Sequence, residues 1–300
     1  NVAHQLRQRI SFRRAMKRSV QNTMQITSAM KMVSAAKLRR AQNAITQMRP
    51  YAEKIQAILA NVSASLDSSE GVFSTKREVK TALVIVITSN RGLCGGFNNN
   101  SIKIAQATIS QYRSEGANVV VLPLGKKAHE SFVRERSDFA EGFGDRSLTI
   151  FDNLNFDNAS EIAQTVMDGF ISKKWDAVEI TYSQFKNAAV QIPTREAYLP
   201  LLPLTTPEDN KTVEIDYIFE PSLQEIVKNI LPSALKTQLY KALLDSNAAE
   251  HGARMTAMHS ATENAGDLLQ DLKITYNKAR QTSITTEILE IVAGSEALGG

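Results

Sequence analysis

Apolar residues near the start of the chain recur every three or four positions, as they do along one face of a helix. The stripe comprises Ala41, Ile45, Met48, Ala52, Ile55, Leu59, Val62 and Leu66. Upstream, Ile26, Met30 and Val33 keep the same spacing on a slightly displaced stripe. This heptad spacing predicts one long amphipathic helix within residues 1–67, and Pro50 predicts a kink or local break in it.

The end of the chain has the same character. Ser222 followed by Glu225 forms a capping box at which a helix can begin, and Gly294 is a plausible stop. Spacings of four and three link Leu223, Val227 and Ile230, then Leu235, Leu239 and Ala242, then Leu272, Tyr276 and Ala279, and finally Ile284, Ile288 and Ile291. These spacings therefore predict a second long helix within residues 209–300. Because no isolated helix of such length is stable in water, we expect the two helices to pack together.

The middle of the chain, residues 78–205, alternates between strand and helix patterns. Strands are predicted at 81–87, 118–122, 177–182 and 189–199, and helices at 100–113, 126–136 and 160–173. Pro193 places the last strand near a sheet edge, and no strand can be assigned to 145–155. The alternation predicts an α/β domain with an open sheet flanked by helices.

Charge is distributed very unevenly over the 300 residues. The net charge of +4 combines +11 in residues 1–60, −1 in 61–207 and −6 in 208–300. The single cysteine, Cys94, excludes an internal disulfide framework. No apolar run reaches the length of about 18 residues that a membrane helix needs. A basic helix could bind nucleic acid or anionic lipid as a coiled-coil adaptor, but the apolar seam, the few aromatic residues and the acidic last segment favour a protein partner.

One loop is a candidate for phosphate chemistry. The residues from Arg91 to Gly96 follow a predicted strand and precede a helix, where α/β folds bind phosphates. The loop lacks both G-x-G-x-x-G and the Gly-Lys-Ser/Thr ending of a P-loop, so a tight structural turn is the favoured interpretation. An α/β nucleotide-binding enzyme that uses this loop is the alternative function.

Other reactive residues give weaker signals. Cys94 would be reactive if a helix N-terminus lowered its pKa, although a buried side chain is the simpler interpretation. His251, Met255 and His259 share a helix face, which favours packing over metal binding. No Ser/His/Asp arrangement, metal-ligand spacing or carboxylate pair stands out, so we predict no catalytic, cofactor-binding or metal-binding residues.

Four longer motifs go beyond periodicity. They are ITSAMKMVSAAKLRRAQ at 26–42, TSNRGLCGGFN at 88–98, EHGARMTAM with ATENA at 250–258 and 261–265, and YNKARQTSITTEILEIVAG at 276–294. Each resembles the corresponding part of the gamma subunit of F-type ATP synthases, and together they follow the family's order over most of the chain.

The resemblance implies an antiparallel coiled coil of the two terminal helices with a Rossmann-like α/β domain at its base. It implies a non-catalytic rotor that couples rotation of the membrane c ring to ATP synthesis or hydrolysis. The implied partners are three alpha and three beta subunits, the epsilon- or delta-type stalk subunit and the c ring, with no nucleic acid. Mg-ATP and ADP would bind the alpha and beta subunits, and this chain would bind no cofactor.

The matched motifs also imply contact residues. Met30, Lys31, Arg254, Arg280 and Gln281 would meet beta subunits, Lys31 facing an acidic lever. The foot region near the c ring would include Tyr217, Phe219 and Glu220.

Two departures from the family pattern concern the start of the chain and its cysteines. Residues 11–18 add about one heptad between motifs that the family joins almost directly, and the dithiol switch of chloroplast gamma subunits is not expected with only Cys94. The Arg-rich, acid-free residues 1–18 and the first residue, Asn1, favour a peripheral protein of the mitochondrial inner membrane facing the matrix. The alternative is the cytoplasmic face of a bacterial membrane.

Overall fold

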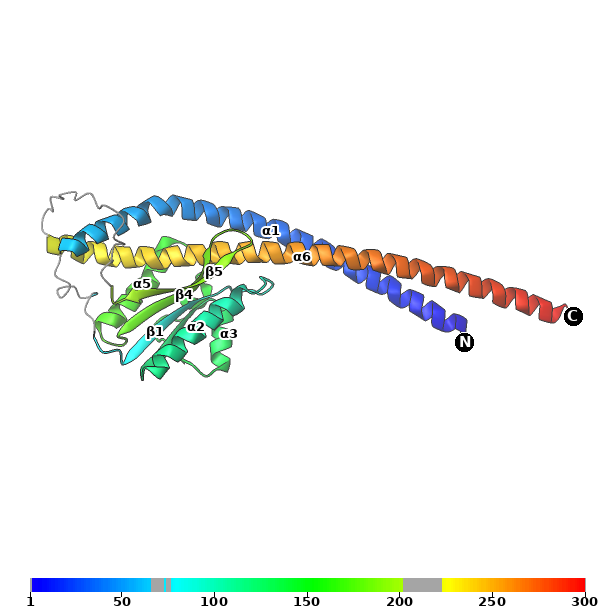
Figure 1. Ribbon diagram of the computed structural model, residues 1–300, viewed down its shortest axis with the longest axis horizontal. Helices are drawn as coiled ribbons and strands as arrows, with labels where there is room; N and C mark the ends of the chain where they lie inside the picture. The colour runs from blue at the N-terminus through cyan, green and yellow to red at the C-terminus, as the bar shows by residue number, and fades with distance from the viewer. Residues whose placement is uncertain (1, 66–72, 74–76, 202–222, 300) are drawn as a thin grey trace. The chain divides into compact units, whose positions relative to one another are not determined.

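The computed structural model describes residues 2–65, 73, 77–201 and 223–299, and the chain forms two units. The terminal unit combines Asn1–Ser34 with Met255–Gly300, and the sheet unit is Ala35–Arg254. Helices α1 (Val2–Ser65) and α6 (Leu223–Leu298) each contribute to both units (Figure 1). We describe the units one at a time.

Both predicted long helices are present. Helix α1 continues through Pro50, so the local break that the sequence allowed at this residue is not present. Helix α6 also continues through a proline, Pro232. The N-terminal capping box begins at Ser222, which lies outside the described residues.

In the terminal unit, the face of α1 that packs against α6 differs from the predicted face. We call the residues of the two helices that face each other the seam. The less exposed positions are Ile10, Arg13, Lys17, Val20, Met24, Thr27, Lys31 and Ser34, which keep a strict alternation of three and four. Thr27 and Ser34 are only 9% and 3% exposed, whereas Ile26 and Val33 are 60% and 57% exposed. The predicted stripe of Ile26, Met30 and Val33 is therefore wrong at Ile26 and Val33, whereas Met30 is half-buried. The seam stays in phase with the downstream heptad even where its residues are polar.

The α6 seam in this unit is similarly regular. It comprises Met258, Thr262, Ala265, Leu269, Leu272, Tyr276, Ala279, Ser283 and Thr286. The prediction for Leu272, Tyr276 and Ala279 is confirmed. The continuation to Ile284, Ile288 and Ile291 is wrong, because all three are exposed. Ile284 lies one position away from the seam residue Ser283, and Ile288 and Ile291 lie in residues 288–296, all of which are exposed.

Polar contacts join the two helices of the terminal unit in antiparallel order. Thr262 Oγ1 donates to Thr27 Oγ1 over 2.8 Å, and Arg13 Nη1 donates to the Thr275 carbonyl over 2.9 Å. The Lys17 ammonium lies 5.9 Å from the centre of the Tyr276 ring. As residue numbers rise along α1 they fall along α6, so the predicted antiparallel pairing is confirmed. The seam pairs these polar groups across the helices and also buries apolar side chains, among them Met258 and Leu269.

In the sheet unit, α1 follows the predicted heptad. Leu38, Ala41 and Ile55 are buried, and the seam positions between them are half-buried. The side chains of Leu59 and Val62, and all of Leu66, lie outside the described residues.

The five-stranded sheet has the order β3-β2-β1-β4-β5. Its strands are β1 (Thr81–Ile87), β2 (Asn118–Leu124), β3 (Asp138–Phe139), β4 (Ala177–Phe185) and β5 (Gln191–Leu199). All neighbours are parallel except β4 and β5, which form an antiparallel hairpin. Strand β5 lies at the edge, as Pro193 predicted, because proline cannot donate to a further strand. The sequence did not reveal the two-residue β3.

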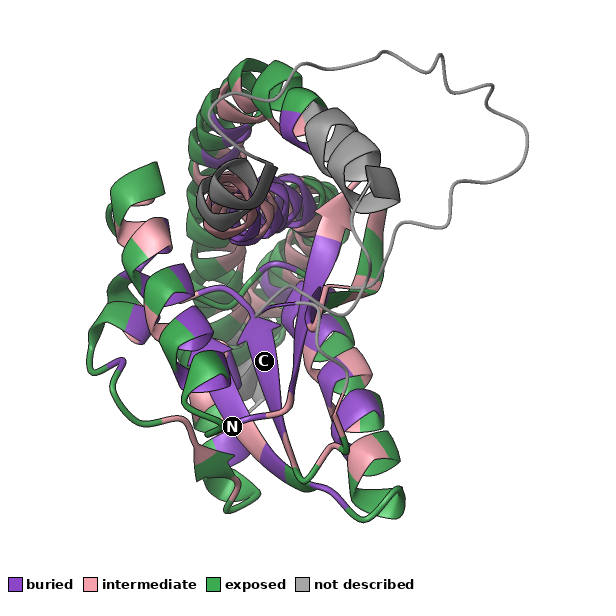
Figure 2. Cartoon of the chain, turned by 90° about the vertical axis from the view of Figure 1, so that its left-hand side faces the viewer, coloured by how far each residue is buried: buried purple, intermediate pink, exposed green. Residues whose placement is uncertain are grey.

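Helices cover both faces of the sheet. They are α2 (Phe97–Ser114), α3 (Lys126–Arg134), α4 (Arg146–Thr149) and α5 (Phe156–Ile171). Alternate residues of β1 point to opposite faces: Val84 and Val86 pack with α2 and α3, while Leu83 and Ile85 pack with α5 and with residues 235–243 of α6. Figure 2 shows these buried strands between helices whose outer sides are exposed. The predicted α/β layering is confirmed, and α6 forms part of its core.

Candidate functional site

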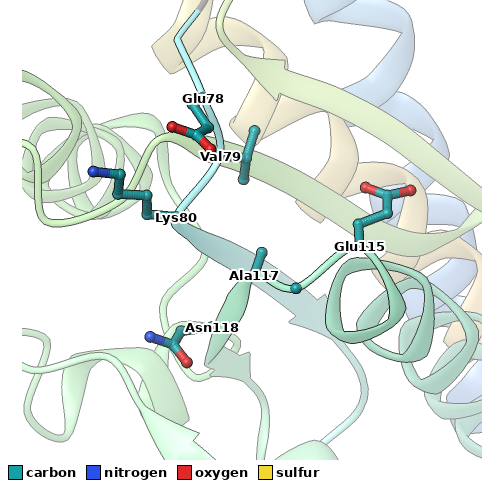
Figure 3. A pocket seen from close by; sticks show the side chains of 7 residues that line it. Glu78, Val79, Lys80, Glu115, Ala117 and Asn118 are labelled. Atoms are coloured by element: carbon teal, nitrogen blue, oxygen red, sulfur yellow. The ribbon is translucent and has the colours of Figure 1, made fainter.

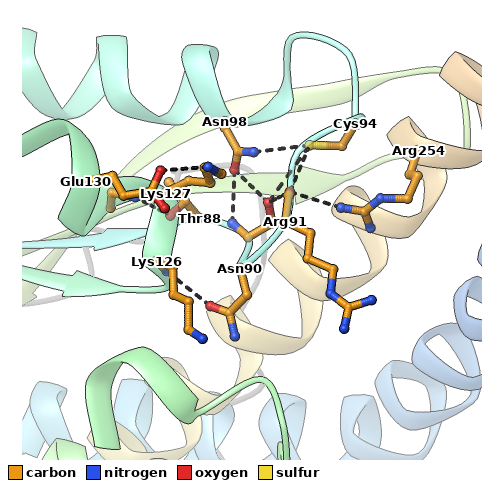
Figure 4. Close-up of polar contacts among 11 residues, drawn as sticks. Thr88, Asn90, Arg91, Cys94, Asn98, Lys126, Lys127, Glu130 and Arg254 are labelled. Carbon is orange, nitrogen blue, oxygen red and sulfur yellow. Dashed lines mark hydrogen bonds and ion pairs between the residues drawn. The ribbon is translucent and has the colours of Figure 1, made fainter. Parts of the chain in front are cut away.

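The carboxyl ends of β1 and β2 form the edge where parallel sheets bind phosphates. There, the first amide groups of α3 already have partners (Figure 4). The Lys126 amide donates to Asn90 Oδ1 over 3.0 Å, the Lys127 amide to the Ser89 carbonyl over 3.2 Å, and the Ala128 amide to Thr88 Oγ1 over 2.9 Å. A phosphate would have to displace these bonds, because it needs the same amide donors.

The loop before α2 is also closed upon itself. Asn98 Oδ1 accepts from both the amide and the hydroxyl of Ser89, and Asn98 Nδ2 donates to Cys94 Sγ over 3.2 Å. Gly95 has a φ of 58°, a conformation that glycine adopts without strain. These contacts support the interpretation of residues 91–96 as a tight structural turn.

Helix α6 fills the crevice beside this loop. The strand order reverses between β1 and β4, which is where open α/β sheets leave room for a ligand. Ala249 and Ala253 of α6 pack there with Cys94, Phe97 and Phe185.

Glycine at position 252 permits this close approach. A Cβ at Gly252 would lie 3.2 Å from Ala188 Cα. Side chains of α6 thus occupy the crevice at the reversal of strand order, where open α/β sheets bind ligands.

Arg254 locks α6 to the loop. Its guanidinium donates to the carbonyls of Arg91 and Gly92, each over 3.1 Å, and to Glu250 Oε1 over 2.6 Å. Both Arg254 and Glu250 are buried. Arg254, which the resemblance placed at a beta-subunit contact, is therefore directed into its own chain in this structure, and its donors are engaged by the loop.

Burial also governs the other candidate groups of the sheet unit. It raises the pKa of the Cys94 thiol despite the nearby Arg254, so Cys94 is a buried cysteine and not an activated thiolate. Burial, with help from Arg254 and Lys37, lowers the pKa of His251 to about 4. Within the described residues, no group of three or more His, Cys, Asp or Glu side chains is arranged to hold a metal ion.

An open pocket lies at the other end of the strands, beside the amino ends of β1 and β2 (Figure 3). Residues 78–80 and 115–118 line it, just before β1 and β2 begin. Ligands of α/β folds bind beyond the carboxyl ends of the strands, whereas this pocket lies at the amino ends. It is therefore not placed as an α/β active site would be.

The terminal unit presents a different kind of candidate site, an apolar surface. Its exposed large apolar residues are Phe12, Met16, Ile26, Met32 and Val33 on α1, and Leu268, Ile274, Ile284, Ile288, Leu289, Ile291 and Val292 on α6. We call this set the apolar surface. Many large apolar residues thus lie outside, while several seam positions hold polar residues such as Thr27 and Ser34. Because exposed apolar side chains can serve protein binding, these residues are the candidate binding surface of the terminal unit.

The predicted contact residues of the terminal unit lie beside the apolar surface. Met30 and Lys31 are half-buried, and Arg280 and Gln281 are exposed. Lys31 Nζ lies 3.1 Å from His259 Nδ1, a contact that the sequence analysis missed because the two residues are far apart in the chain. Tyr217, Phe219 and Glu220 lie outside the described residues.

The fold and these sites define an α/β protein whose crevice is filled by its own terminal helix and whose long helices expose an apolar surface. A family model described as ATP synthase matches residues 5–298. The ATP synthase gamma chain of Flavobacterium psychrophilum is 54% identical over 283 residues, covering 94% of this chain and 96% of that one. The gamma chain of Cytophaga hutchinsonii is 48% identical, covering 93% and 95%. The chain therefore belongs to the ATP synthase family and is a homologue of gamma chains.

Solved structures have the same fold. A chain of the Euglena gracilis mitochondrial ATP synthase, solved with OSCP, F1 and c-ring, aligns with a TM-score of 0.64 at 21% identity, covering 96% of this chain and 94% of that one. A chain from the central stalk and c-ring of the Tetrahymena thermophila enzyme aligns with a TM-score of 0.54 at 24% identity, covering 79% and 99%.

Two further observations concern the membrane. The gamma-chain relatives named above are bacterial, so the mitochondrial membrane is not confirmed. Among the described residues, no helix is both long enough and apolar enough to cross a bilayer.

Proposed function

We propose that this chain is the central rotor subunit of an F-type ATP synthase, in which it couples rotation of the c ring to ATP synthesis or hydrolysis at the beta subunits. Its membership of the family, over almost the whole chain, is the main support. The single structural observation that favours this function is the distribution of polarity in the terminal unit, where large apolar side chains are exposed while polar residues such as Thr27 and Ser34 are buried in the seam.

This polarity suits a helix pair that other subunits surround. A free helix pair in water buries its apolar side chains between the helices. Here Ile26 and Val33 are instead 60% and 57% exposed, although the adjacent Thr27 and Ser34 are buried. Burying such side chains against a partner is worth about 1.5 to 3 kcal/mol each, so an enclosing ring of subunits would be stabilised by them.

The chain can couple rotation to catalysis at the beta subunits because it is asymmetric. A ring of three alpha and three beta subunits has three equivalent catalytic sites, and each would meet a different side of a single chain. The side that favours the closed state of one beta subunit shifts that site toward tight nucleotide binding. Rotation moves the preference to the next site, so the rotor itself needs no catalytic residue, and Mg-ATP and ADP would bind the alpha and beta subunits.

Particular residues would make these contacts. We assign Met30 and Lys31 to the acidic lever of the beta subunit, and the exposed Arg280 and Gln281 to beta-subunit loops. Arg254, which the resemblance also assigns to a beta-subunit contact, has donors engaged by Glu250 and the loop within this chain. The c ring and the epsilon-type subunit would bind near Tyr217, Phe219 and Glu220. The bacterial relatives favour a peripheral position on the cytoplasmic face of a bacterial membrane.

Reconstitution tests the proposal. The purified chain is mixed with the alpha and beta subunits of the same organism, and ATP-driven rotation is observed with a probe attached to the chain. We expect a stable complex that rotates. Ile291→Glu should weaken assembly, whereas Glu290→Gln, at the neighbouring exposed position, should not. Failure of the unmodified chain to assemble with alpha and beta would contradict the proposal.

A further inference from the structure

His259 lies where α6 meets α1 in the terminal unit and contacts charged residues on both helices. Its Nδ1 atom is 3.1 Å from the Lys31 ammonium of α1. Its Nε2 atom is 3.5 Å from Glu263 Oε1, one helical turn further along α6. Among the described residues, these are the charged groups with a recorded contact to the ring.

The contacts fix the protonation state of the neutral ring. A lysine ammonium has three donors and no acceptor, so Nδ1 must accept the hydrogen bond from Lys31. The ring proton is then on Nε2, which faces the Glu263 carboxylate. In this tautomer His259 holds the ammonium of Lys31 at the helix seam.

Protonation reverses the interaction. When Nδ1 gains a proton it can no longer accept, and two positive groups then face each other at hydrogen-bond distance. Glu263 stabilises the imidazolium from the other side.

We propose that His259 is a positioning residue that holds Lys31 against the seam when neutral and releases it to an acidic partner surface when protonated. This inference rests on the proposed function, because Lys31 is the residue assigned to the acidic lever. It adds a pH-dependent element to that contact: the lysine is withdrawn at high pH and available at low pH.

The experiment compares variants that mimic the two states. His259→Gln keeps a hydrogen-bond acceptor but cannot titrate, so Lys31 stays held. His259→Ala removes the acceptor, so Lys31 is always released. ATP hydrolysis by the complex reconstituted with alpha and beta is measured from pH 5.5 to 8.5, together with the amount of assembled complex.

We expect the unmodified complex to match His259→Gln at high pH and His259→Ala at low pH. The two variants should differ by about twofold to fivefold, the range of a partly exposed charged contact. Glu263→Gln should move the crossover to lower pH, because it removes the charge that stabilises the imidazolium. In a Lys31→Met background, the two His259 variants should become indistinguishable.

The outcomes separate this inference from the proposed function. If all variants assemble and hydrolyse ATP with the same pH profile, the positioning role is wrong while the rotor function stands. The positioning role is also wrong if the difference between the His259 variants persists without Lys31. If the unmodified chain does not assemble, the rotor function fails and this inference fails with it.

Discussion

Arg254 and Glu250 show how the surroundings of one side chain decide its role. Both are charged residues one helical turn apart on α6, and by sequence alone either could face solvent. In the structure both are buried, and the guanidinium links the carboxylate to two loop carbonyls. Burial, the largest influence, raises the pKa of Glu250, whereas the nearby Arg254 opposes that rise.

Breaking this pair should destabilise the sheet unit. Arg254→Met leaves the Glu250 carboxylate buried without its main partner and should cost about 3 kcal/mol of unfolding free energy. Urea unfolding, followed by the fluorescence of the single tryptophan, Trp175, measures the loss. Adding Glu250→Gln should recover part of it, because no unpaired charge then remains. Equal stability of the single variant and the unmodified chain would rule out this role for Arg254.

Asp245 should make the stability of the sheet unit depend on pH. Burial raises its pKa to about 6, Glu196 adds to the rise, and Lys241 and Arg49 oppose it. A carboxyl whose pKa is higher in the folded state favours folding when protonated. The contribution of Asp245 to the free energy of unfolding should therefore be greatest at low pH. It should fall by on the order of 2 kcal/mol as the pH rises from about 4 through 6.

The control for this prediction is Asp245→Asn. It cannot ionise, so the difference in unfolding free energy between it and the unmodified chain should shrink as pH is lowered from 8 to 5. A difference that stays constant over this interval would show that Asp245 is not the titrating group.

At the scale of elements, α5 depends on one glycine for its packing. A Cβ at Gly169 would overlap the indole ring of Trp175, whose Nε1 donates to the Val166 carbonyl over 2.9 Å. Gly169→Ala should therefore destabilise the sheet unit by about 1 to 3 kcal/mol even though alanine favours helix, because the overlap outweighs the propensity.

A matched substitution isolates the packing effect. A Cβ at Gly92 would have no atom within 4 Å, so Gly92→Ala should change the unfolding free energy by no more than about 0.5 kcal/mol. Thermal unfolding of both variants tests the pair. Similar melting temperatures for Gly169→Ala and Gly92→Ala would contradict the packing argument.

The elements themselves were largely predictable. Continuous apolar runs and breaker residues indicated β1, β2, β4, β5 and the helices between them, because strand and helix periods leave different patterns. The two-residue β3 could not be found, since it has too few residues for a period. The seam of the terminal unit was misassigned because apolar periodicity does not reveal buried polar residues such as Thr27, whose hydroxyl accepts a hydrogen bond from Thr262 of the second helix.

At the scale of the whole molecule, the two units differ in what stabilises them. The sheet unit has a large apolar core on both faces of the sheet, whereas the terminal unit has only a two-helix seam of polar contacts and a few buried apolar side chains such as Met258 and Leu269. In the isolated chain, amide hydrogen exchange should therefore be faster by at least about tenfold in helix residues 2–34 than in β1 and β4. Exchange in 2–34 should slow on assembly with alpha and beta, and equal protection of both units before assembly would contradict this ranking.

The sequence by itself determined the two long helices, the α/β domain between them and, through four long motifs, the family. These features depend on local periodicity and on residues that are adjacent in the chain. Only the tertiary structure decided that Arg254 turns inward to the loop, that His259 meets Lys31, and that Ile26, Val33 and Ile288 stay outside while Thr27 and Ser283 lie in the seam. The physical reason is that burial and charge pairing depend on which distant residues share a space, and a pattern along one helix does not record what the other helix brings to it.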